Sequence, residues 1–141
     1  MLLYILKYCL KNLITDPLGP TITINFAATS NPELTSYSYI TYYENKFILE
    51  AYTDSTQPDN IYELDNIKSV LSRLVESVSS GRNITSVSFS GTVVYTRDSI
   101  PLTKRELRRL LPRVPLLSEN TGFGAGGVRG VLRDIRYLCS V

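Results

Sequence analysis

The chain contains no histidine and only two cysteines among its 141 residues. Histidine is the commonest general base near neutral pH and the commonest transition-metal ligand, so acid–base catalysis and zinc binding lose their usual residue. The abundant serines and threonines have no histidine to activate them as nucleophiles. A carboxylate site for a hard cation stays chemically open, but the sequence places no pair of carboxylates together. We therefore expect a non-enzyme, with no metal and no cofactor.

The two cysteines lie near opposite ends of the chain, each on the apolar side of an expected helix. Cys9 and Cys139 are too few for a disulfide framework, so we predict buried free thiols and a reducing compartment. Long hydrophobic runs are also missing. The apolar stretch in residues 1–15 is short and contains lysines, and no small-residue cleavage site follows it. These features predict no transmembrane helix, no signal peptide and an intracellular location, in the cytoplasm or nucleus of a host cell if the protein is viral.

Charge is distributed unevenly along the chain. Residues 1–96 hold six lysines and arginines against nine acidic residues, a net charge of −3. Residues 97–141 hold nine lysines and arginines against four acidic residues, a net charge of +5. This asymmetry is the main functional clue in the sequence. With 43% hydrophobic and 20% charged residues, residues 1–141 fit one folded domain.

Periodicity predicts the elements of the first hundred residues. Apolar residues at helical spacing predict a helix over Met1–Thr15, which Pro17 ends. A second helix is expected to open at Asp59 or Asn60 and to end at Gly81. Alternating apolar residues predict strands over Thr21–Ala27, Ser36–Tyr43, Lys46–Thr53 and Ile84–Thr96, the last with a bulge or bend at Gly91. The second and third strands meet at Glu44-Asn45, which fits a tight hairpin.

The last third contains two further helices. Thr103 and Glu106 have the spacing of a capping box, with Leu102 and Leu107 placed as a hydrophobic staple. This helix should stop near Leu111, ahead of Pro112. An extended link, a glycine-rich loop and a final helix are expected over Pro112–Pro115, Ser118–Gly127 and Val128–Cys139.

These elements predict an α+β fold in the order α-βββ-α-β-α-α, with an antiparallel sheet of about four strands packed against helices. Residues 1–100 would form the sheet with two helices. Residues 101–141 would form a basic two-helix segment with a glycine-rich hinge at 118–127.

Both late helices segregate their charges. In the first, the basic residues fall within an arc of about 140° at 100° per residue, opposite three leucines. In the second, the arginines fall within about 60°, and another arginine lies between the helices. The predicted polyanion-binding residues are Lys104, Arg105, Arg108, Arg109, Arg113, Arg129, Arg133 and Arg136. Arginine's planar fork suits phosphates. A solvated face paired with the acidic N-terminal two thirds is the alternative.

The glycine-rich loop has the spacing G-x-G-x-x-G at Gly122, Gly124 and Gly127. The chain offers no following parallel strand and no acidic residue about twenty positions later. A hinge that lets the last helix dock or exchange is therefore preferred to a nucleotide-binding fold, although Arg129 beside free helix amides could hold an anion.

The sequence as a whole predicts a binding or assembly protein that engages RNA, DNA or an anionic membrane through these helices. Self-association is also expected, since an aromatic hairpin edge and a glycine hinge favour pairing. A small viral structural, matrix-like or accessory protein fits the profile. The alternative is an adaptor or inhibitor that binds one protein partner through the N-terminal helix or the tyrosine-rich hairpin, using Leu6, Tyr39, Tyr42 and Tyr43. The hairpin tyrosines could also stack bases.

Overall fold

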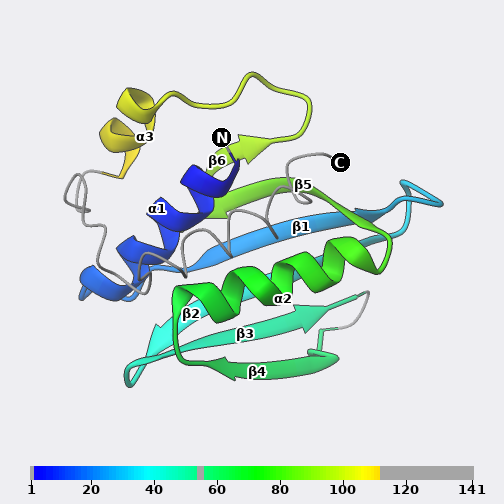
Figure 1. Cartoon of the computed structure of the whole chain (residues 1–141), viewed down its shortest axis with the longest axis horizontal. Helices are drawn as coiled ribbons and strands as arrows, with labels where there is room; N and C mark the ends of the chain where they lie inside the picture. Colours follow the sequence, from blue (N-terminus) through cyan, green and yellow to red (C-terminus); the bar gives the residue numbers. More distant parts are fainter. Residues whose placement is uncertain (1, 54–55, 112–141) are drawn as a thin grey trace.

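The computed structural model describes residues 2–53 and 56–111, which form a six-stranded antiparallel sheet and three helices (Figure 1). The strands lie side by side in the order β4-β3-β2-β1-β5-β6. In chain order the elements are α1 (Leu2–Thr15), β1 (Ile22–Ala28), β2 (Thr35–Tyr43), β3 (Lys46–Tyr52), β4 (Asn60–Leu64), α2 (Ile67–Ser79), β5 (Arg82–Phe89), β6 (Thr92–Thr96) and α3 (Lys104–Leu110). The α+β class and the antiparallel sheet are therefore confirmed.

The first three strands follow their sequence pattern closely. Ile22, Ile24 and Phe26 of β1 are all buried on one face of the sheet, as their alternation predicts. The β2–β3 hairpin turns at Glu44 and Asn45, whose φ angles are 51° and 66°. Two consecutive positive φ values are typical of the type I′ turn, whose twist matches that of the strands. The predicted hairpin is confirmed.

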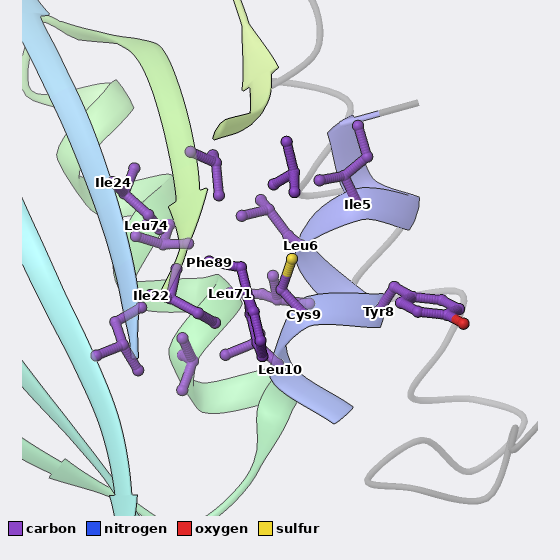
Figure 2. Packing of buried hydrophobic residues seen from close by; sticks show 14 of the residues in the cluster. Ile5, Leu6, Tyr8, Cys9, Leu10, Ile22, Ile24, Leu71, Leu74 and Phe89 are labelled. Atoms are coloured by element: carbon purple, nitrogen blue, oxygen red, sulfur yellow. The ribbon is translucent and has the colours of Figure 1, made fainter. Parts of the chain in front are cut away.

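The helices α1 and α2 cover the same face of the sheet (Figure 1). Figure 2 shows Leu6 and Leu10 of α1 directed toward Phe89 of β5 and Leu71 of α2. Cys9 lies in the same cluster with 0% exposure, and burial raises the pKa of its thiol to about 12. The predicted buried free thiol is confirmed for Cys9, whereas Cys139 lies outside the described residues.

The expected helix opening at Asp59 or Asn60 is wrong. Residues 60–64 form β4 on the edge of the sheet, where Leu64 pairs with Phe47 and Tyr62 with Leu49. The helix begins only after Asn66, whose side-chain oxygen accepts a hydrogen bond from the Ser69 amide at 2.9 Å. The apolar residues of this segment fit the spacing of a strand as well as that of a helix. Pairing with β3 decides in favour of the strand.

The single strand expected over Ile84–Thr96 is also wrong. Ser90 (φ 46°) and Gly91 (φ 87°) form a turn between β5 and β6, so the chain bends at Gly91, one of the two predicted alternatives, and closes a hairpin there. The bulges fall elsewhere, one of them between Val87 and Ser88. With β4, this split gives six strands instead of about four. The described order is α-ββββ-α-ββ-α.

The helix α1 packs in the core through its apolar residues, and burial extends to residues on its polar side. Tyr8, Lys11 and Asn12 are only 5%, 7% and 1% exposed. The helix is therefore covered on its polar side as well. The described helices include none with the length and apolar character to cross a membrane. The expected link, glycine-rich loop and final helix lie outside the described residues.

Replacing Leu6 with alanine tests this packing. Leu6 is 1% exposed, so Leu6→Ala should lower the free energy of unfolding by about 2–5 kcal/mol, the usual cost of such a cavity. The control is Ile14→Ala in the same helix, at a side chain that is 37% exposed, which should cost about 1 kcal/mol or less. Urea denaturation monitored by circular dichroism gives both values. Equal losses in the two variants would contradict the described position of α1.

Candidate functional site

The helix α3 is short, and its position is fixed at both ends. Thr103 Oγ1 accepts a hydrogen bond from the Glu106 amide at 3.1 Å, and Glu106 Oε1 accepts one from the Thr103 amide at 3.0 Å. These reciprocal bonds are the predicted capping box. Leu107 and Leu111 are 0% and 5% exposed and join the hydrophobic core, with Leu102 packed against it. The backbone of α3 is therefore anchored to the body of the protein.

Four basic side chains project from this anchored helix, and we call them the α3 cationic face. Lys104, Arg105 and Arg109 are exposed, and Arg108 is half-buried. The ion pairs among the described residues join Lys46 to Glu63 and Asp65, and Arg73 to Glu76; none involves α3. Within residues 2–53 and 56–111, the acidic N-terminal region therefore does not neutralise these cations.

Two tyrosines of α1 lie beside the α3 cationic face. The Lys104 ammonium lies 5.0 Å from the centroid of the Tyr4 ring, within cation–π range. The Tyr4 and Tyr8 rings are 5.8 Å apart. Burial raises the pKa of Tyr8, as does Tyr4, while the positive charge of Arg108 acts in the opposite direction. The Nε of Arg108 is buried without a hydrogen-bond partner in the described structure.

Sequence reasoning did not assign Tyr4 and Tyr8 to the site. Their separation of four residues places both on one side of a helix, which is the only local signal available. That this side faces α3 depends on tertiary packing. Figure 1 shows α3 on the α1 side of the molecule, away from the β4 edge. The remaining predicted polyanion-binding residues, Arg113, Arg129, Arg133 and Arg136, lie outside the described residues, as do Gly122, Gly124 and Gly127.

The predicted partner-binding residues are not brought together. Leu6 points into the core and presents no surface to a partner (Figure 2). The Tyr42 ring packs edge-on against the Phe47 ring, with the ring centroids 4.8 Å apart, on the face of the sheet that the helices cover. Tyr39 is partly exposed on the opposite face, between Thr23 and Glu50 of the neighbouring strands. Tyr43 is 67% exposed beside the hairpin turn.

The side of β2 and β3 opposite α1 and α2 carries another pair of aromatic side chains. Tyr37 and Tyr52 stack with ring centroids 4.6 Å apart and planes 6° apart. The Tyr52 hydroxyl donates a hydrogen bond to Glu50 at 3.2 Å, and burial together with this carboxylate raises the Tyr52 pKa. A carboxylate among the rings repels phosphate groups, so this surface is a poorer nucleic-acid site than the α3 cationic face. No cluster of three cysteine or acidic side chains suited to a metal occurs in the described part of the chain.

Searches of protein-family models, curated proteins and solved structures find no match to this chain.

The capping box can be tested through the titration of Glu106. Its hydrogen bonds with Thr103, and less strongly the charge of Arg109, lower the pKa of Glu106 below 4.5. Because the pKa of Glu106 is lower in the folded state, its ionised carboxylate stabilises the folded protein at pH values above the unfolded-state pKa. This contribution is lost as the pH falls through the folded-state pKa. Carboxyl-carbon NMR should show Glu106 titrating below 4.5 in the wild type and closer to it in Thr103→Ala. Identical titration curves would show that the box contributes nothing to the helix start.

Proposed function

We propose that the protein binds the phosphate backbone of nucleic acid through the α3 cationic face. The observation that carries the proposal is the absence of ion pairs to Lys104, Arg105, Arg108 and Arg109 within the described residues, on a helix whose backbone is anchored. Cations that make no ion pair within the described residues have none to break there when they bind a polyanion, and the Lys104 ammonium lies only over the Tyr4 ring face. These cations also lose less conformational freedom than cations on a disordered tail.

The geometry of the face suits phosphates. Positions 104, 105, 108 and 109 lie on adjoining rows of the helix and span about 7.5 Å along its axis at 1.5 Å per residue. Three of the four residues are arginines, whose forked donors can hold two phosphate oxygens at once. A face of this length reaches only a few phosphates, so its binding should be moderate in strength and dependent on salt.

Nucleic acid is favoured over an anionic membrane because α3 has already buried its apolar side. A helix that lies in a membrane interface inserts a free apolar face between lipids. Leu107 and Leu111 are instead buried in the protein. Leu110 is the one leucine of α3 that is exposed, with an exposed fraction of 44%. The face therefore offers charge with little apolar surface, which is what a phosphate backbone requires.

The proposal predicts a defined change in salt dependence. Arg105→Gln/Arg109→Gln removes two exposed cations that make no described ion pair. Fluorescence anisotropy with a labelled 20-base-pair DNA and a single-stranded RNA should show weaker binding by the variant. For the duplex, the slope of log K against log salt should become less steep by about 1.8, since each lost phosphate contact removes about 0.9. Lys68→Gln/Arg97→Gln is the matched control, because it removes the same charge from exposed positions outside α3.

Three results would contradict this function. One is wild-type binding that does not change with salt. Another is an equal loss of affinity in the control variant, which would indicate a diffuse effect of net charge. The third is binding to vesicles of phosphatidylserine and phosphatidylcholine with no binding to either nucleic acid, which would assign the α3 cationic face to a membrane surface.

A further inference from the structure

A polar hollow lies between α2 and the sheet, on the face that α2 covers. Its volume is about 150 Å³. The floor comes from β2 and β3, where the small side chains of Ser38 and Ala51 leave space beneath the helix. The walls are formed by Tyr62 of β4 and by side chains of α2 and β5, among them Arg73 and Arg82. Two arginines therefore line one small hollow.

The first of these cations is held in place by two contacts. The Arg73 guanidinium lies 3.9 Å from the centroid of the Tyr62 ring, and its Nη1 is 2.9 Å from Glu76 Oε2. Stacking and an ion pair together fix the plane of the guanidinium and leave some of its five N–H donors unused. Arg73 is therefore a positioned donor group at the wall of the hollow.

The second cation has no partner among the described residues. Arg82 is the first residue of β5 and is half-buried, and no hydrogen bond, ion pair or ring contact of its side chain occurs in the described structure. Gly81, with a φ of 95°, turns the chain sharply from α2 into β5 and so brings Arg82 beside the helix end. The negative end of the α2 dipole favours a cation there, but it does not satisfy the donors of the guanidinium.

The serines at the end of α2 supply acceptors instead of donors. The Ser80 hydroxyl donates to the Ser77 carbonyl at 2.9 Å, and the Ser77 hydroxyl donates to the Arg73 carbonyl at 3.4 Å. Because each hydroxyl hydrogen is engaged, the oxygen lone pairs remain for a ligand. A ligand that fills the hollow should therefore carry a hydrogen-bond donor as well as a negative charge.

The charge around the hollow favours one negative charge on the ligand. Arg73 and Arg82 face a single lining carboxylate, that of Glu76. A neighbouring hollow of about 380 Å³ shares Arg82 and is lined by Glu33, which would repel a dianion. The smaller hollow, with a volume of about 150 Å³, is suited to a small ligand.

We infer that this hollow binds a small hydroxycarboxylate. The carboxylate lies between the guanidinium groups of Arg73 and Arg82, and the hydroxyl donates to Ser77 or Ser80. This site is separate from the α3 cationic face and takes a different class of ligand. The arginines and serines all lie within residues 73–82 and match no known binding motif, and the hollow beside them exists only because α2 packs over the sheet.

Titration of the ¹⁵N-labelled full chain with sodium L-lactate tests this inference, with ionic strength held constant by sodium chloride. Amide signals of Ser77, Ser80 and Arg82 should shift and saturate. Propionate, which lacks only the hydroxyl, should bind about three- to tenfold more weakly, the range expected for one neutral hydrogen bond. Arg82→Gln should weaken lactate binding about tenfold or more, as for a lost charge-assisted bond, while Arg97→Gln at an exposed position away from the hollow should leave it unchanged.

A second variant keeps the test decisive if Arg82→Gln does not fold. Ala51→Val enlarges a side chain on the floor without changing charge and should also weaken binding. Linear shifts without saturation, or equal affinity in wild type and both variants, would overturn the site. Equal affinities for lactate and propionate would overturn the hydroxyl contact, and tighter binding of inorganic phosphate would overturn the assignment to a monoanion.

Discussion

The burial of α1 is the constraint on which the described structure depends. One side of this helix packs against β5 and α2 through Leu6 and Leu10, and another meets α3 through Tyr4. A helix of seven residues such as α3 is too short to be stable alone in water. It persists because Leu107 is buried in the core and the capping box fixes its start. The position of the α3 cationic face is therefore a consequence of hydrophobic packing, and the charges only occupy the side that packing leaves exposed.

Local sequence signals predict those elements whose structure is decided locally. The capping box at Thr103 and the hairpin turn at Glu44-Asn45 depend on neighbouring residues, and both are confirmed. Asn60–Leu64 is different, because its five residues fit either the first turns of a helix or an edge strand. The backbone of β3 offers an unpaired edge at this point, and pairing with it outweighs the helical pattern. No signal within the segment itself reports that edge.

The candidate site likewise has some features that the local sequence predicts and others that depend on tertiary structure. Spacing alone places Lys104, Arg105, Arg108 and Arg109 on one side of a helix, and the capping box predicts that this helix is folded. Their lack of ion pairs within the described residues depends on where the acidic residues lie in three dimensions, which spacing does not reveal. The hollow beside Arg82 depends on tertiary structure for its floor, since Ser38 and Arg82 are 44 positions apart in the sequence. The proposed ligand-binding residues Arg73, Ser77, Ser80 and Arg82 lie close together in the sequence, but the floor that completes the hollow comes from β2 and β3, over which α2 packs.

The two proposed sites select anions through different interactions, one through long-range charge attraction and the other through direct hydrogen bonds. The α3 cationic face attracts phosphates by charge density, an interaction that decays over about 8–10 Å at physiological salt. Glu63 belongs to β4 and Asp65 follows it, and Figure 1 shows this edge of the sheet away from α3. Both carboxylates share the single charge of Lys46, so the three side chains keep a net negative charge that repels a polyanion approaching from that side. Binding should therefore be one-sided, with α3 toward the nucleic acid. The hollow instead relies on direct hydrogen bonds in a confined volume, where salt screens weakly. A small monoanion can occupy it without competing for the surface that a polyanion would cover.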